Sequence, residues 1–165
     1  MRKIETLRFG QIEIDEKKII HFDRGIPAYS SEKEFVLIPY NSEDPSESPY
    51  LFMQSVKSPD LAFFITSPYY FFQDYEFEIA DDVISELDIQ SPDDILVYVI
   101  ITVPGGSVKD MTANLLAPVI INVKNFKAKQ NVIENSSYTT KHRLFPAENA
   151  QTDSRPKTMK IGMRR

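Results

Sequence analysis

Short hydrophobic runs, each closed by a turn residue, follow one another along the first two thirds of the chain. Alternation of apolar and polar positions is typical of strands, because successive side chains of a strand point to opposite faces. Gly10 separates two such runs and predicts an N-terminal hairpin. Pro39, which cannot donate a backbone hydrogen bond, predicts an edge strand. The strands expected in this part are 4–9, 11–14, 19–22, 35–40, 50–56 and 61–66.

Continuous apolar runs indicate more deeply buried strands further along the chain. Residues 95–103 (ILVYVIITV) contain seven β-branched residues among nine, which favours a strand buried on both faces over a helix. Residues 115–123 (LLAPVIINV) predict a second strand, in which Pro118 requires a bulge or an edge position. Residues 126–133 complete the set.

Helix signals are few. Residues 81–87 combine Asp81, a candidate N-cap, with Asp82 in the first turn and apolar residues on one face. Residues 91–94 (SPDD) predict a single capped turn before the strand at residue 95. The chain is therefore expected to be all-β, mainly strands with one or two short helices. We expect a small antiparallel barrel-like or sandwich domain, with its strand order open.

Charge is distributed unevenly around a net value of −5. Residues 40–110 carry fourteen acids against Lys57 and Lys109, a formal charge of −12, whereas residues 151–165 carry +4. A domain with so acidic a stretch repels nucleic acid and attracts basic proteins. We predict one domain over residues 1–146 and a basic, flexible tail over residues 147–165, which has almost no large apolar residue.

The tail allows two interpretations. It is either a solvated extension or a segment that folds back on the acidic body and inhibits docking there.

The residue inventory excludes several kinds of chemistry. The chain has no cysteine, which excludes disulfides, thiolate metal sites and a cysteine nucleophile. Its five glycines form neither a P-loop, a dinucleotide fingerprint nor a serine elbow. Gly105-Gly106-Ser107 follows a strand, and we interpret it as a turn rather than an anion cradle. His21 and His142 are far apart in sequence, and we expect one partly buried and one solvated histidine rather than a metal pair. No cofactor is expected.

The residue inventory also indicates the cellular compartment. A chain without cysteine fits a reducing compartment, and polar residues follow Met1 at once, so we expect a cytoplasmic protein without a signal peptide.

Aromatic side chains gather between residues 69 and 77, among Asp74, Glu76 and Glu78 and with no basic residue nearby. Stacking of nucleic-acid bases is disfavoured, because phosphate affinity comes from Lys and Arg. Two interpretations remain. Tyr75 and Phe77 alternate with the acids and suit a strand with one core face and one solvated face. The acidic face could in addition dock a basic protein.

Seven segments along the chain form a distinctive set: Ile4-Glu5-Thr6 with Gly10, Gly25-Ile26-Pro27, 35–39 (FVLIP), Met53-Gln54-Ser55, 58–63 (SPDLAF), 71–77 (FFQDYEF) and 111–122 (MTANLLAPVIIN). In these segments the chain resembles the FliW family of flagellar assembly factors. Together these segments cover about residues 3–144. Ala28-Tyr29 departs from the family, which usually has glycine and a large apolar residue there.

The resemblance implies a compact β-barrel-like fold, no cofactor and no enzymatic activity. It implies two alternative partners, flagellin and the carbon storage regulator CsrA, an RNA-binding repressor of flagellin mRNA translation. The protein would hold the regulator away from RNA until flagellin competes for it. It would itself bind neither nucleic acid nor membrane.

Two other hypotheses stay open. One is a dedicated flagellin chaperone with little regulator binding, and the other is a hydrolase that uses two carboxylates. The candidate partner-binding residues are Asp74, Tyr75, Glu76, Phe77, Glu78, Asp81, Asp82, Met111 and Asn114.

Overall fold

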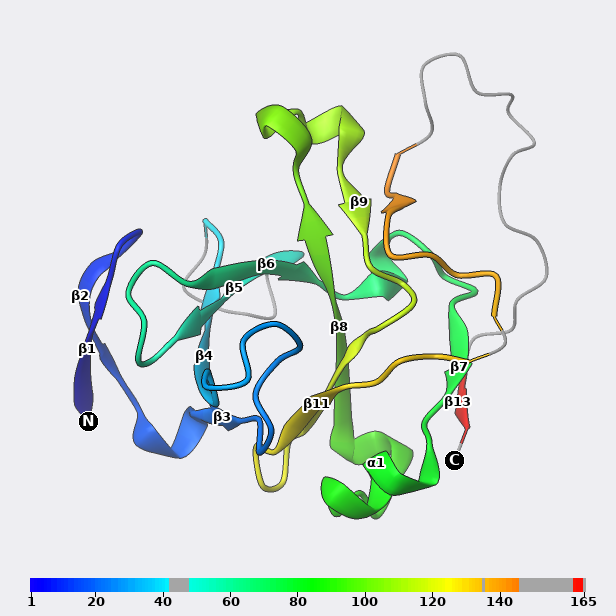
Figure 1. Ribbon diagram of the computed structural model, residues 1–165, viewed down its shortest axis with the longest axis horizontal. Coiled ribbons are helices and arrows are strands. Elements are labelled where there is room, and N and C mark those ends of the chain that lie inside the picture. Colours follow the sequence, from blue (N-terminus) through cyan, green and yellow to red (C-terminus); the bar gives the residue numbers. More distant parts are fainter. Residues whose placement is uncertain (42–47, 135, 146–161, 165) are drawn as a thin grey trace.

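The computed structural model describes residues 1–41, 48–134, 136–145 and 162–164 (Figure 1). Its strands are β1 (Arg2–Thr6), β2 (Gly10–Ile14), β3 (Ile20–His21), β4 (Glu34–Pro39), β5 (Tyr50–Ser55), β6 (Ala62–Thr66), β7 (Glu76–Glu78), β8 (Ile95–Thr102), β9 (Thr112–Ala113), β10 (Val119–Asn122), β11 (Ala128–Gln130), β12 (His142–Arg143) and β13 (Gly162–Arg164). The α-helix is α1 (Asp81–Glu86), and 3-10 turns are η1 (Glu16–Lys18), η3 (Pro68–Tyr70), η4 (Pro92–Asp94), η5 (Pro104–Gly106) and η6 (Val108–Asp110). The predicted mainly β fold with short helices is confirmed.

Seven strands form one continuous antiparallel path in the order β11-β10-β8-β6-β5-β4-β3. The two ends of the path meet. The N–H of His21 in β3 donates to the carbonyl oxygen of Phe126 at 2.8 Å, and His21 forms a bridge with Lys127, beside β11. The sheet is therefore barrel-like, as predicted, and closure removes the unpaired edges that a flat sheet would expose.

Inward-facing apolar side chains fill the barrel. Phe35, Met53, Ile65 and Val119 are completely buried, and they pack with partly buried side chains such as Phe63. This interior is built from alternate positions of the central strands, which explains why the two-residue alternation predicted those strands well.

β8 lies between two cores. Val97 and Val99 belong to a second cluster that contains β7 and α1, whereas Tyr98 and Ile100 pack against the barrel interior. The prediction that this strand is buried on both faces holds for its middle. It fails near the start, where Leu96 is 42% exposed, because no element covers that position in the described part of the chain.

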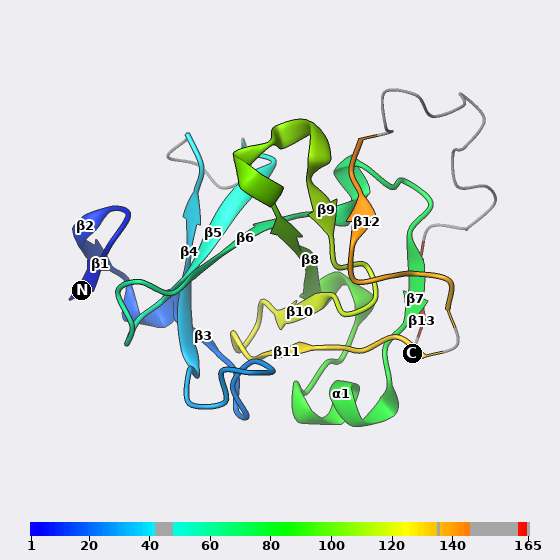
Figure 2. The same ribbon diagram turned by 45° about the horizontal axis from the view of Figure 1, so that its top comes forward.

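The N-terminal hairpin of β1 and β2 projects at one end of the molecule (Figures 1 and 2). Ile4 and Ile14 pack with Val36 and Val56 in a small third cluster on the outside of β4. Gly10 begins β2 with φ +68°, a conformation that favours glycine and allows the chain to reverse there.

Three predictions were wrong in detail. Pro39 does not mark an edge strand, because β4 lies between β3 and β5 in the sheet. The strand predicted over residues 115–123 begins only at Val119, after Pro118, and the separate strand β9 precedes it. A proline at the strand entrance avoids the loss of a ladder hydrogen bond. The N-cap of α1 is Ala80 rather than Asp81, and it makes no side-chain capping bond. Ser91 does cap its turn by accepting from the N–H of Asp93, as predicted.

The turn at residues 26–29 contains Ala28 and Tyr29, the two residues that depart from the family pattern. Tyr29 N–H donates to the carbonyl oxygen of Ile26 at 2.7 Å, and Ala28 has φ +73°. Pro27 followed by a residue with positive φ matches a type II turn, which favours glycine at its third position. Ala28 thus occupies a conformation that costs an L-residue about 1 kcal/mol.

Much of the predicted basic tail, 147–165, lies outside the described residues. Its segment Gly162–Arg164 is strand β13, which pairs with β7 in parallel.

Candidate functional site

β7 separates a buried face from an acidic one. Tyr75, Phe77 and Ile79 are 1%, 4% and 2% exposed and belong to the second core. Asp74 and Glu78 are exposed on the other side. The alternation predicted from the sequence is confirmed, and the carboxylates are the members of this segment that a partner can reach.

The acidic surface continues into the first turn of α1. Asp81 and Asp82 are both exposed, and negative charge at a helix N-terminus is favourable. At the other end of α1, the buried side-chain amide of Asn122 donates to the carbonyl oxygens of Leu87 (2.7 Å) and Asp88 (3.2 Å). Asn122 thus satisfies C-terminal carbonyls of the helix and fixes α1 against β10.

Met111 and Asn114, which the sequence also suggested, have structural contacts in the fold. Met111 is 3% exposed and packs in the second core. The side-chain oxygen of Asn114 accepts from the N–H of Ala117 at 3.0 Å and shapes the turn before β10. The candidate residues therefore lie on neighbouring elements of the fold. Tyr75, Phe77 and Met111 are buried, so the acidic candidates are the ones that a partner can reach.

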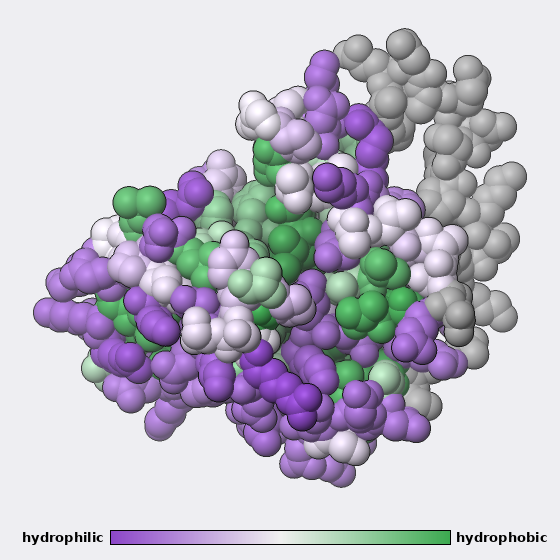
Figure 3. Space-filling view, in the orientation of Figure 1, coloured by the Kyte–Doolittle hydropathy of each residue, from purple (hydrophilic) through white to green (hydrophobic). Residues whose placement is uncertain are grey.

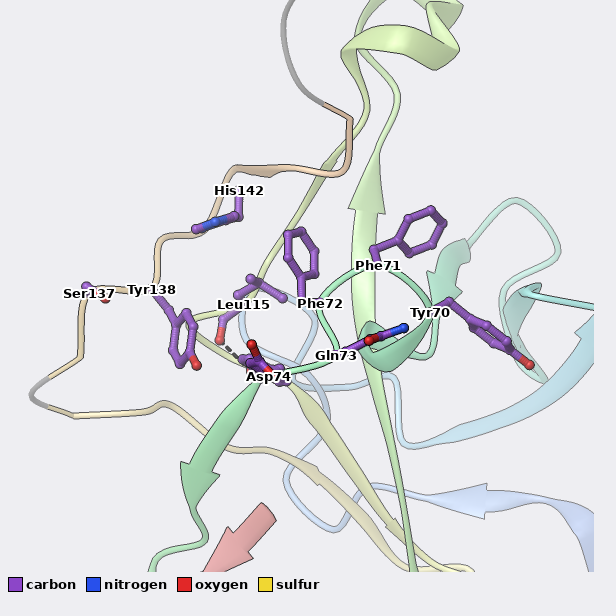
Figure 4. Close-up of a pocket in the computed structure, with 10 residues that line it drawn as sticks. Tyr70, Phe71, Phe72, Gln73, Asp74, Leu115, Ser137, Tyr138 and His142 are labelled. Atoms are coloured by element: carbon purple, nitrogen blue, oxygen red, sulfur yellow. Dashed lines mark hydrogen bonds between the residues drawn. The ribbon is translucent and has the colours of Figure 1, made fainter. Parts of the chain in front are cut away.

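A hollow of about 480 Å³ opens beside Asp74 (Figure 4). It is lined by Tyr70, Phe71, Phe72, Gln73, Asp74, Tyr75, Leu115, Ser137, Tyr138 and His142. Three separate parts of the chain supply this lining: the segment before β7, the segment between β9 and β10, and the segment leading into β12. Its wall is mostly aromatic, which suits an apolar side chain of a partner.

Hydrogen bonds and ring contacts hold the wall together. The hydroxyl of Tyr75 donates to the carbonyl oxygen of Leu115 at 2.6 Å, the dashed line in Figure 4. The Tyr138 ring lies edge-on to Tyr75 with centroids 4.8 Å apart, and its hydroxyl accepts from the N–H of Glu76 at 3.1 Å. These contacts fix the segment before β7 from two directions.

Burial favours the neutral forms of the buried tyrosines and of the histidine in this region. Desolvation raises the pKa of Tyr69 to about 12 and raises the pKa values of Tyr75 and Tyr138 as well. Desolvation also lowers the pKa of His142, whose ring packs edge-on against Phe72 at 5.2 Å and whose Nδ1 is buried. Asp74 is the acidic residue among those that line the hollow.

The residues considered for other chemistry do not assemble. His21 is exposed, with Nδ1 3.8 Å from a carboxylate oxygen of Glu34, while His142 is half-buried beside the hollow. Among the described residues, no three of His, Asp and Glu are grouped to hold a metal ion. Gly105 and Gly106 form a 3-10 turn with positive φ values, as expected of a plain loop.

Sequence reasoning missed one buried charge. Glu32 is 8% exposed and accepts hydrogen bonds from the hydroxyls of Ser55 (2.6 Å) and Ser58 (2.5 Å). These bonds lower the pKa of Glu32, with a further contribution from Lys57. The arrangement joins the loop before β4 to the turn after β5, and no local pattern in the sequence signals it.

Comparison with known proteins shows which family the chain belongs to. A family model described as FliW protein matches residues 3–144. The chain belongs to the FliW family. Its relatives include the flagellar assembly factor FliW of Geobacillus sp. (strain WCH70), 42% identical over 149 residues that cover 90% of this chain and 99% of the relative. The FliW of Bacillus subtilis (strain 168) is 48% identical over 141 residues, 86% of this chain and 95% of the relative.

A solved structure agrees with the family match. The crystal structure of a flagellar assembly factor FliW superimposes with a TM-score of 0.81 at 41% identity, and the match covers 89% of this chain and 99% of that one. The resemblance seen in the sequence is confirmed. Within the described residues, no helix is long and apolar enough to cross a membrane.

Proposed function

We propose that this flagellar assembly factor works by binding two proteins in alternation, flagellin and the translational regulator CsrA. While it holds the regulator, flagellin mRNA is translated, and flagellin that accumulates displaces the regulator. The observation that carries the proposal is membership of the FliW family across residues 3–144. The protein would act in the cytoplasm, without a cofactor and without enzymatic activity.

Charge supports the regulator as a partner. Asp74, Glu78, Asp81 and Asp82 are exposed on β7 and α1 or immediately before them, and no lysine or arginine lies between Lys57 and Lys109. An RNA-binding protein presents basic surface, so this acidic surface would attract it. The face seen in Figure 3 is hydrophilic along its lower margin, where α1 lies in Figure 1.

The aromatic hollow suits an apolar anchoring side chain of a partner. We expect such an anchor from flagellin rather than from a partner that binds through basic residues. Phe71 and Phe72 are half-buried, and Tyr70 is 58% exposed at its rim. Buried aromatic and aliphatic anchors carry most of the energy of protein interfaces. This observation also supports the second candidate, a dedicated flagellin chaperone with little regulator binding.

A calorimetric titration separates the two candidates. The protein is titrated with CsrA at low and at high salt, and flagellin is then added to the complex. Partner switching predicts regulator binding that salt weakens and flagellin displaces. Absence of regulator binding at both salt concentrations, together with flagellin binding and suppressed flagellin aggregation, would establish the chaperone instead. Absence of binding to both proteins would contradict both candidates.

A further inference from the structure

β7 has one strand partner among the described residues, and that partner is the C-terminal strand β13. The two strands run parallel, with Gly162 opposite Glu76, Met163 opposite Phe77 and Arg164 opposite Glu78. Figures 1 and 2 both show β13, in red, beside β7 and apart from the barrel. The main-chain edge of β7 that faces β13 is called the β7 edge below.

The β7 edge is suited to strand addition. An edge strand presents N–H and C=O groups in a row, and an extended peptide can pair with them whatever its side chains are. Here the strand is held rigidly from behind, because Phe77 is buried in the second core and the N–H of Glu76 is bound by the Tyr138 hydroxyl. A fixed edge loses little entropy on pairing, which favours binding.

The charges around the edge select what adds to it. Five carboxylates lie within nine residues: Asp74, Glu76, Glu78, Asp81 and Asp82. The segment that supplies β13, residues 151–165, carries five basic residues and one acid. Charge therefore favours the same pairing that the backbone makes, and it disfavours an acidic segment at this position.

β13 lies outside the part of the chain that the family model matches. The family match ends at residue 144, and the alignment with the Geobacillus relative covers 99% of that protein with 149 residues. The crystal structure of a family member is likewise matched over 99% of its length by 89% of this chain. The family match thus ends before β13, and we therefore treat β13 as occupying the β7 edge as a ligand does rather than as part of the core.

We propose that the β7 edge is a strand-addition site for an extended, positively charged protein segment, and that β13 occupies it as an internal competitor. An outside segment must displace β13 before it can pair with β7. The pairing of β13 with β7 within the chain follows from the strand register. The identity of the outside segment, a basic stretch of the RNA-binding regulator, rests on the proposed function.

The test uses a synthetic peptide of residues 151–165, acetylated and fluorescently labelled, and measures its binding by anisotropy. It is titrated with the chain ending at Ala150 and with the full chain. We expect the shortened chain to bind the peptide about tenfold more tightly, because a segment tethered in the same molecule competes at an effective concentration of millimolar order. No binding to the shortened chain, or equal binding to both chains, would overturn the proposal.

A matched peptide separates strand pairing from charge. The Met163→Pro peptide keeps the side-chain charge of +4 but lacks one N–H and resists pairing. It should bind the shortened chain at least about tenfold more weakly than the natural peptide, and the same substitution in the full chain should restore peptide binding. Equal affinities for the two peptides would reduce the contact to charge alone and contradict the proposal. Regulator binding, measured separately on the shortened chain, tests the proposed function whatever the peptide does.

Discussion

The hydroxyl of Tyr75 donates a hydrogen bond to the carbonyl oxygen of Leu115, 40 residues away in sequence, at 2.6 Å. Both residues are almost completely buried, so this bond ties the entrance of β7 to the segment before β10 inside the second core. It also sets the back wall of the aromatic hollow, which Leu115 and Tyr75 both line. The acidic surface and the hollow are thus positioned by the same contact.

Removal of this hydroxyl should destabilise the fold. Tyr75→Phe leaves the buried carbonyl of Leu115 without this donor, and we expect the free energy of unfolding to fall by about 1–2 kcal/mol. Urea denaturation measures the change. Tyr70→Phe is the matched control, because Tyr70 is 58% exposed and its hydroxyl can bond to water, and it should shift stability by less than about 0.5 kcal/mol. Equal effects of the two substitutions would show that the bond to Leu115 contributes nothing.

The turn at Ala28 offers a stabilising substitution. Ala28→Gly removes the strain of an L-residue at φ +73°. It should raise the free energy of unfolding by about 0.5–1 kcal/mol, after subtraction of the entropic cost of ordering glycine from the unfolded chain. Thermal denaturation measures it. Ala62→Gly, at the start of strand β6, should lower stability by a similar amount, because glycine weakens a strand. A loss of stability in Ala28→Gly would mean that the turn tolerates alanine without strain.

The buried carboxylate of Glu32 should make stability depend on pH. Its pKa is lowered in the folded state, so the folded protein holds its proton less tightly than the unfolded chain does. Stability from this group is present above the ordinary pKa of 4.5 and is lost as pH falls through the lowered folded value. We expect Glu32→Gln to cost about 2 kcal/mol at pH 7, since hydrogen bonds to a charged acceptor are strong.

Denaturation curves at pH 7 and at a series of values below 4.5 check this. The difference between Glu32→Gln and the natural chain should shrink as pH falls. Glu13→Gln is the control, because Glu13 is exposed on β2. A difference between Glu32→Gln and the natural chain that stays constant with pH would exclude the ionised carboxylate as its source.

Local patterns explain why much of the fold could be predicted. The hairpin around Gly10, the pair β5 and β6, and the buried strand β8 all depend on alternation, β-branching and turn residues that lie within a few positions of one another. The alternation of Tyr75 and Phe77 with Asp74 and Glu78 likewise predicted which side chains reach solvent. The family resemblance suggested the proposed partners, which no local pattern contains.

What could not be predicted depends on contacts between distant segments. Closure of the barrel requires His21 to meet Phe126, and the hollow requires Tyr138 and His142 to lie beside the segment before β7. The burial of Glu32 depends on hydroxyls more than twenty residues away. β13 is three residues long and lies in a polar segment, so its pairing with β7 has no hydrophobic signature in the sequence.

Docking of CsrA on the acidic surface beside β7 can be tested directly. The decisive measurement is the affinity of CsrA for the double variant Asp74→Lys, Glu78→Lys, made in the chain ending at Ala150 so that β13 does not intervene. The matched control is Glu13→Lys, Asp60→Lys, which changes the net charge equally at two exposed positions in β2 and in the turn between β5 and β6. We expect the first variant to bind about tenfold or more weakly at low salt, and the control to bind like the natural domain. Equal affinities of the two variants would contradict docking at this surface.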